Sequence, residues 1–117
     1  MTLLLIPVLA TVLCSIAVAA DKSGTVAGTV ALVSARTKTF INGASHAKLV
    51  LRWDKRTVSI QANEDGDFGG SLKVGTYCLQ RAEDENRNPL TIYVGQTKCF
   101  TIKHDRHTRF DVVITAP

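Results

Sequence analysis

The sequence predicts an all-β protein built as one small β-sandwich domain, and three observations support that prediction. No segment shows the apolar repeat of three to four residues that marks an amphipathic helix. Short alternating runs of apolar and polar residues recur instead, separated by Gly, Asn and Asp. A strand–turn–strand unit lies at residues 65–79. The predicted strands lie near residues 25–33, 47–53, 57–62, 68–72, 76–81, 90–102 and 108–115.

The first element is an apolar leader. Residues 1–20 carry no charged side chain and end in the small-residue A-x-A pattern of a secretory signal peptide, although the Lys or Arg that such a peptide usually has near Met1 is missing. An uncleaved membrane anchor is the alternative, but about 16 apolar residues interrupted by Pro7 are short for a membrane span. We expect cleavage after Ala19 or Ala20, which leaves residues 21–117 as a single domain without a membrane span, in the extracellular space or the periplasm.

Residues 65–79 form the central unit of the predicted domain. Asp65-Gly66 favours a turn because glycine accepts a positive φ and the Asp carboxylate caps the turn backbone. Gly75 plays the same part ahead of Thr76 and Tyr77, a pair that favours extended backbone. Alternation along that strand places Tyr77 in the core. Its expected neighbours are Leu49, Phe68 and Leu79.

The remaining connections follow from turn residues. Residues 54–56 form a tight connection between the second and third predicted strands. Residues 86–89 mark a loop, because Pro89 has no N–H to give to a central ladder. Gly95 lies inside the long predicted strand 90–102, where it indicates a bulge or a bend.

Four segments resemble the carboxypeptidase regulatory-like domain family, which has a transthyretin-like (prealbumin-like) fold. That family typically shows an early glycine-bearing strand, an A-x-V-x-L strand, a D-G-x-F step and an L-x-x-G-x-Y-x-L strand. The corresponding segments here are residues 24–30, 47–51, 65–68 and 72–79. The resemblance covers about residues 24–115. It implies a seven-stranded, Greek-key β-sandwich that serves as an accessory or binding module and not as an enzyme.

Two of the three cysteines, Cys78 and Cys99, remain when the leader with Cys14 is removed. An even pair in an exported domain indicates one disulfide. Strand alternation places both side chains on the outer face of the sheet, opposite the apolar residues beside them. A bridge that closes about 22 residues adds on the order of 3 kcal/mol to stability. Two free thiols for metal or redox chemistry are the alternative, although no C-x-x-C spacing favours it.

Strands that alternate in direction sort the loops into two ends of opposite charge. The acidic end gathers loops 34–46, 63–67 and 82–89, and the basic end gathers loops 54–56, 73–75 and 103–107. The candidate residues for binding an anionic partner are Lys55, Arg56, Lys73, Arg106 and Arg109. Clustered charge of one sign attracts a partner of the other sign, while ordinary solvated loops are the alternative interpretation.

Two patterns favour metal ions, and neither is complete. His104 and His107 are three residues apart, which places their side chains on opposite faces of an extended strand. Asp65 and Asp67 offer oxygen ligands for calcium, but calcium takes six or more oxygens and the EF-hand spacing is absent. We therefore expect no metal site and no cofactor.

Two aromatic side chains have open assignments. Trp53 continues the apolar phase of residues 49–51, which favours the core over an exposed platform for stacking sugars. Tyr93 is out of phase with the apolar residues around it. It is either an exposed aromatic or a cover for the disulfide.

The sequence contains no recognisable catalytic set, because it lacks a nucleophile elbow, a phosphate-binding glycine loop and paired catalytic carboxylates. We therefore predict an exported, non-enzymatic binding, adhesion or accessory module. Its loops recognise a protein or an anionic polymer, such as an acidic glycan at a cell surface, and no specific nucleic acid. The alternative hypothesis is an iron- or calcium-dependent site on the same fold, with or without enzymatic activity, since intradiol dioxygenases bind iron through Tyr and His on a related sandwich.

Overall fold

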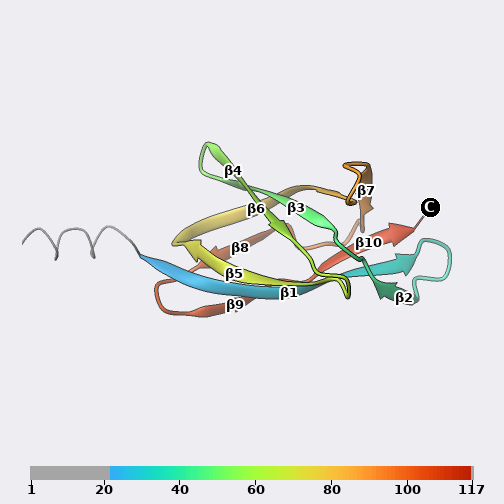
Figure 1. The fold of residues 1–117 in the computed structure, drawn as a ribbon, viewed down its shortest axis with the longest axis horizontal. Helices are drawn as coiled ribbons and strands as arrows, with labels where there is room; N and C mark the ends of the chain where they lie inside the picture. The colour runs from blue at the N-terminus through green and yellow to red at the C-terminus, as the bar shows by residue number, and fades with distance from the viewer. Residues whose placement is uncertain (1–21, 117) are drawn as a thin grey trace, which may run out of the picture.

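A computed structural model describes residues 22–116 as a curled β-sheet of ten strands (Figure 1). These residues contain no helix, so the prediction of an all-β fold is confirmed. The strands are β1 Ser23–Ser34, β2 Phe40–Gly43, β3 Lys48–Trp53, β4 Arg56–Gln61, β5 Asp67–Lys73, β6 Gly75–Glu83, β7 Pro89–Ile92, β8 Cys99–Ile102, β9 His107–Arg109 and β10 Val112–Ala116. The predicted signal peptide at residues 1–20 lies outside the described residues. From residue 22 to residue 116, no helix meets the length and apolarity that a membrane crossing requires.

β1 is the strand on which the sheet is assembled. Its first part pairs antiparallel with β5 and parallel with β9, and its second part pairs antiparallel with β2 and parallel with β10. The sheet then continues from β10 through β7 and β6 to β3 and β4. Gly28 allows one of these close approaches, because a Cβ there would lie 1.8 Å from the carbonyl oxygen of Phe110.

The expected number of seven strands is wrong, and the excess has three local causes. β2 forms within residues 34–46, which were expected to be a loop. The predicted strand 90–102 is divided into β7 and β8 by a connection at residues 93–98. The predicted strand 108–115 is divided into β9 and β10, although both parts keep the same register against β1. The directions of the predicted strands do alternate along the chain.

Gln96 holds the connection between β7 and β8 against β10. Its side-chain oxygen accepts a hydrogen bond from the Val113 amide at 2.7 Å, and its side-chain nitrogen donates to the Asp111 carbonyl at 2.8 Å. Its own backbone N–H donates to the Tyr93 carbonyl at 3.0 Å. One glutamine therefore replaces the backbone pairs that an uninterrupted strand would have made, which is why the predicted strand is broken here and not merely bent at Gly95.

The core fills the inside of the curl, and Tyr77 lies within it at 1% exposure, as predicted. Its ring stacks between Trp53 and Phe100, with centroids 5.7 and 5.6 Å away, and its hydroxyl donates to the Lys73 carbonyl at 2.6 Å. The buried apolar residues are Val26, Val30, Ala47, Leu49, Val50, Leu51, Ala62, Phe68, Tyr77, Leu79, Ala82, Phe100, Ile102, Phe110, Val112 and Ile114. Trp53 packs against this core and is partly buried, which agrees with its predicted place in the core and not on an exposed platform.

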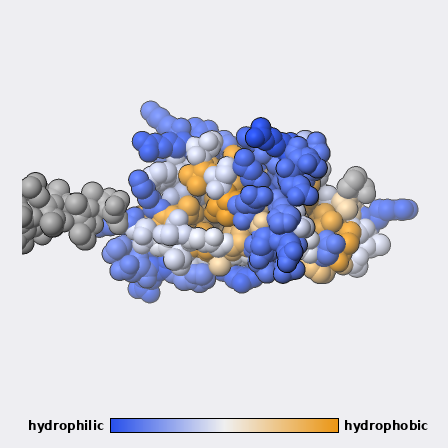
Figure 2. All heavy atoms as spheres, viewed as in Figure 1, coloured by the Kyte–Doolittle hydropathy of each residue, from blue (hydrophilic) through white to orange (hydrophobic). Residues whose placement is uncertain are grey.

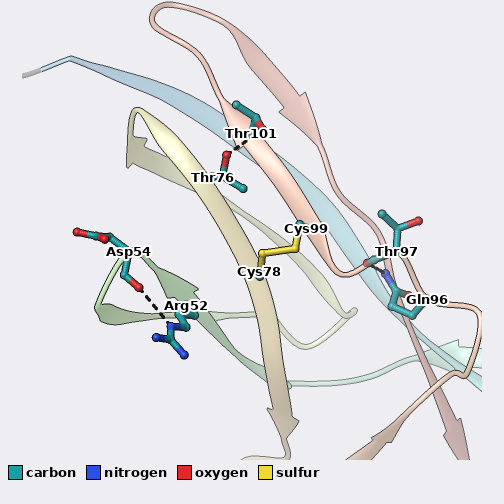
Figure 3. The surroundings of a disulfide bond; sticks show 8 residues. All are labelled: Arg52, Asp54, Thr76, Cys78, Gln96, Thr97, Cys99 and Thr101. Atoms are coloured by element: carbon teal, nitrogen blue, oxygen red, sulfur yellow. Dashed lines mark hydrogen bonds between the residues drawn. A yellow bond between two sulfur atoms is a disulfide. The ribbon is translucent and has the colours of Figure 1, made fainter.

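Cys78 and Cys99 form the predicted disulfide. They are direct partners in the pairing of β6 with β8, and their Cα atoms are 4.0 Å apart. Figure 3 shows the bridge on the face that also carries Thr76 and Thr101, whose hydroxyl oxygens are 3.3 Å apart. Since the neighbouring Tyr77 is buried, the bridge lies on the outer face and links two strands without entering the core.

Candidate anion-binding end

Three turns from separate segments lie toward the end of the sheet at which β1 starts, two of them beside β1 and the β3–β4 turn farther from it (Figure 1). They are the β3–β4 turn at residues 54–55, the β5–β6 turn at Val74, and the β8–β9 connection at residues 103–106. Backbone hydrogen bonds tie two of them to the chain at the start of β1, since Val74 N–H donates to the carbonyl of Lys22, just before β1, and Asp105 N–H donates to the Ser23 carbonyl, at 3.2 and 3.0 Å.

All five residues predicted to bind an anion are exposed. Lys55, Arg56, Lys73 and Arg106 lie on the three turns or at the strand ends next to them. Lys22 and Lys103 are exposed at the same end. Lys22 was missed, although its position just before the first predicted strand was a usable signal. We call this set the basic end: Lys22, Lys55, Arg56, Lys73, Lys103 and Arg106.

Arg109 is placed differently from the other predicted cations. Its guanidinium forms a bidentate salt bridge with Asp111, in which the Nη2–Oδ1 and Nε–Oδ2 distances are both 3.1 Å. The same carboxylate accepts the Thr29 N–H at 2.9 Å. Thr29 lies in the part of β1 between the residues that pair with β9 and those that pair with β10, so this side chain takes the place of a backbone partner. Because Arg109 is already paired with this carboxylate, it is less available to an external anion than the basic end.

Two aspartates lower the positive charge of the basic end. Asp54 and Asp105 both have a φ of 54°, in the left-handed region that Asp enters more readily than most residues. Asp105 Oδ2 lies 3.2 Å from His104 Nε2. Turn geometry accounts for both acids, and the six cations of the basic end outnumber them.

A shallow groove of about 280 Å³ runs along the outer face of the sheet at the basic end. Arg106 is one of its lining residues, and His107 lies beside Thr25, with Nδ1 and Oγ1 2.9 Å apart. Guanidinium and hydroxyl groups are donors suited to carboxylate or sulfate oxygens. The lining residues are Ser23, Gly24, Thr25, Ser71, Asp105, Arg106 and His107.

The acids of the opposite end are used by the turns that carry them. Asp84 Oδ1 accepts the backbone N–H groups of Asn86 and Asn88, both at 2.9 Å, and the hydrogen bond from Asn88 is the main cause that lowers the pKa of Asp84. Asp65 and Asp67 donate their N–H groups to Asn63 Oδ1 at 2.9 and 3.0 Å. These contacts are typical of Asx turns and require no bound ion.

No three His, Cys, Asp or Glu side chains within residues 22–116 are grouped in a way that would hold a metal ion. His104 and His107 turn to separate partners, Asp105 and Thr25. The two tyrosines have different surroundings. Tyr77 is buried in the core, whereas the partly buried Tyr93 ring has Lys38 Nζ 5.1 Å from its centroid. The hypothesis of an iron or calcium site gains no support from these side chains.

The class of protein that emerges is a small all-β domain with one disulfide and one basic end. No protein-family model matches the chain, and no curated protein matches it. Among solved structures, it is similar to a DUF3823 family protein from Parabacteroides merdae, with a TM-score of 0.50 and 20% identity over 81% of this chain and 47% of that one.

Two further solved structures show similarity to the chain. The TIE protein of Bacillus anthracis gives a TM-score of 0.51 at 16% identity, over 80% of this chain and 17% of that one. A Pseudomonas aeruginosa protein with a suggested carbohydrate-binding role gives 0.46 at 14% identity, over 82% and 90%. The chain thus spans less than half of the first two proteins, and at these identities the likeness to those two shows a mixed-sheet β fold alone. None of the three is named as a carboxypeptidase regulatory-like domain.

Proposed function

We propose that the chain is an exported, non-enzymatic binding module whose basic end contacts an anionic partner. The observation that supports this most is the convergence of cations from three separate turns on one end of the sheet. Lys55, Lys73 and Arg106 come from segments far apart in sequence, yet all three are exposed and belong to turns, or strand ends next to turns, toward the same end of the sheet. Loops held on a rigid sheet are where binding residues are most often found.

Binding would combine long-range electrostatic attraction of the anionic partner with short-range hydrogen bonds donated to it. A cluster of like charge raises the local concentration of an anionic partner and speeds its association. This attraction is screened over about 10 Å at 0.1 M salt, so binding that depends on it weakens as salt is added. Arg56 and Arg106 then offer forked donors to carboxylate or sulfate groups, and the groove beside Arg106 gives one such group a place to lie.

An anionic polymer such as an acidic glycan fits this surface better than a small ligand does. The cations are spread over several turns, and a chain of repeated negative charges contacts many of them at once. The motifs at residues 65–68 and 72–79 support the further proposal that the fold is related to the carboxypeptidase regulatory-like domains, whose members are mostly accessory modules. The apolar leader and the disulfide support an extracellular or periplasmic location.

The test compares two triple variants of equal charge change. The first reverses Lys55, Arg56 and Arg106 to Glu at the basic end. The control reverses Arg36, Arg87 and Lys98 to Glu, three exposed cations outside the basic end. Binding to a sulfated and a carboxylated polysaccharide is measured by calorimetry over a salt series, with a neutral dextran as the blank.

We expect the first variant to lose affinity by about tenfold or more, roughly 1.4 kcal/mol, and to lose most of the salt dependence. The control variant should bind like the unmodified protein within a factor of about three, roughly 0.7 kcal/mol. Equal losses in the two variants would show that net charge and not the basic end decides binding. Failure of the unmodified protein to bind either polysaccharide at low salt would contradict an anionic-polymer partner.

A further inference from the structure

β4 and β5 are consecutive strands that leave an open seam between them. In the described part of the chain, β4 pairs with β3 and β5 pairs with β1, but β4 and β5 do not pair with each other. Figure 1 shows the two strands diverging from the turn at residues 62–66, and Figure 2 shows apolar atoms exposed between them. Val58, Ile60 and Leu72 are among the residues that are only partly buried there.

The free edge of β5 presents defined backbone groups. Asp67 directs both of its groups away from β1, because its N–H donates to Asn63 Oδ1 and its carbonyl accepts the Asn63 N–H, at 3.0 and 2.8 Å. Along a strand, the backbone groups of successive residues point alternately toward one neighbouring strand and the other, so the N–H and C=O groups of Gly69 and Ser71, like those of Asp67, point away from β1. The residues opposite them on β1 support this, because Ala27 and Thr25 direct their backbone groups away from β5. The Ala27 carbonyl accepts the Phe110 N–H, and the Thr25 N–H donates to the Arg106 carbonyl.

The middle of this edge, Gly69 to Ser71, lacks the features that usually prevent strand addition, because the charged residues Asp67 and Lys73 lie at the two ends of β5. β5 pairs with β1 over seven residues without a bulge, and it contains no proline. An open cleft of about 540 Å³ lies along its first residues, Asp67 to Gly69. A Cβ atom on Gly70 would meet no atom within 4 Å. Another strand therefore finds free hydrogen-bonding groups at Gly69 and Ser71, and space beside them, while Asn63 and the Tyr77 hydroxyl already bind backbone groups at the two ends of β5.

The sequence of β5 is complementary to itself when it is read antiparallel about Gly70. In this register Gly69 faces Ser71 of a second copy and Phe68 faces Leu72. Asn63 keeps the backbone groups of Asp67, so Asp67 meets Lys73 of the second copy through its side chain on the outer face. Acid meets base, apolar meets apolar, and small meets small. Cross-strand pairs of this kind stabilise antiparallel sheets, and a two-fold arrangement produces each pair twice.

We propose that two copies of this chain associate through β5 to form a two-fold symmetric dimer with a continuous sheet. The outward groups of Gly69 and Ser71 exchange hydrogen bonds across the axis, about four in total. Phe68 and Leu72 lie on the core face, where the second copy covers the apolar opening. Asp67 and Lys73 lie on the outer face and form ion pairs at both ends of the strand.

β4, the other strand on the seam, lacks this complementarity. Antiparallel pairing of β4 with itself about Ser59 places Val58 opposite Ile60 and Thr57 opposite Gln61. No opposite charges meet, so nothing in β4 selects a register. The charge pattern therefore points to β5 as the paired strand.

Self-association is measured by analytical ultracentrifugation of the purified protein over a wide concentration range. Lys73→Glu places two acids opposite each other in the dimer, and Asp67→Lys places two lysines opposite each other. A mixture of these two variants restores an acid–base pair at both ends. Ser71→Pro removes an outward N–H that β1 does not use, so the monomer tolerates it as an edge proline. Lys55→Glu is the matched control for the charge change of Lys73→Glu.

We expect a concentration-dependent dimer for the unmodified protein and for Lys55→Glu. Each of the two β5 charge variants should dissociate about tenfold more readily, and their equal mixture should form heterodimers with the affinity of the unmodified protein. Ser71→Pro should be monomeric with an unchanged melting temperature. A protein that stays monomeric at every concentration overturns the proposal, and so does a dimer that survives Ser71→Pro. A mixture that fails to associate overturns it even when the single variants behave as expected.

Lys73 belongs both to the basic end and to this pairing, but the two proposals are tested separately. The test of anion binding changes Lys55, Arg56 and Arg106 and reads affinity, whereas the test of pairing reads molecular mass. Because the two copies run antiparallel, the dimer would carry its two basic ends at opposite extremes.

Discussion

Truncating Tyr77 is the sharpest test of how this core is built. The side chain is 1% exposed, stacks on Trp53 and Phe100, and donates its hydroxyl to the Lys73 carbonyl. Tyr77→Phe keeps the ring and removes one hydrogen bond, which costs about 1 kcal/mol. Tyr77→Ala also removes the stacked ring and leaves a cavity, so its cost is about 3–5 kcal/mol. That is a large share of the 5–15 kcal/mol by which domains are typically stable, as an order of magnitude.

The assay is equilibrium unfolding in urea, followed by the fluorescence of Trp53, the single tryptophan and a direct neighbour of the altered ring. About 1 kcal/mol corresponds to a change of roughly 4–8 °C in melting temperature for a domain of this size, so Tyr77→Ala should melt at least about 12 °C lower. A loss below about 1 kcal/mol for Tyr77→Ala would refute the packing argument. Equal losses for the Ala and Phe variants would show that the hydroxyl matters and the ring does not.

Burial gives the same residue a pH dependence. Removal from water raises the pKa of Tyr77 above its ordinary value of 10.0, because the charged phenolate is disfavoured in the core. The folded state then holds a proton that the unfolded state releases. Its contribution to stability is complete below about pH 10 and is lost as the pH rises through the folded-state pKa. The difference in stability between the unmodified protein and Tyr77→Phe should therefore shrink above pH 10.

Two further changes test the outer parts of the sheet. Replacing both Cys78 and Cys99 by Ser should lower the free energy of unfolding by about 3 kcal/mol in urea titrations, while alkylation of the unmodified, unreduced protein should find no thiol at either position. Gln96→Ala should cost about 1–3 kcal/mol, because the Val113 N–H and the Asp111 carbonyl lose their partner. Faster hydrogen exchange at the Val113 amide would locate that loss, and unchanged exchange there would argue against the bridging role of Gln96.

The predictable parts of the fold are those in which one strand carries its own signal. Tyr77 and Cys78 follow from period-two alternation, which assigns neighbouring residues to opposite faces without any knowledge of the partners. β2 has no such signal, because Phe40 and Ile41 are 66% and 50% exposed and the segment is a strand only through its pairing with β1. The break at Gln96 depends on distant backbone groups of β10 and has no local signature.

The candidate site shows the same division. The order of strands sufficed to bring Lys55, Arg106 and the other turn cations to one end, because each turn reverses the chain. The pairing of Arg109 with Asp111 was also visible in the sequence, since residues two apart on an extended segment share a face. Asp54 and Asp105 were harder to weigh, because their place in the turns depends on backbone angles that composition does not reveal.

The position of β1 has a consequence for how the chain folds. β1 is the first strand in sequence, and its parallel neighbours β9 and β10 are nearly the last, with Thr25 and His107 separated by 82 residues. Contacts between such distant segments close large loops and slow the folding transition. During synthesis β1 is made first, but it keeps unpaired backbone groups until residues 107–116 have followed. In the meantime β2 and β5 are the partners available to it, so β1 can form its antiparallel pairs before its parallel pairs.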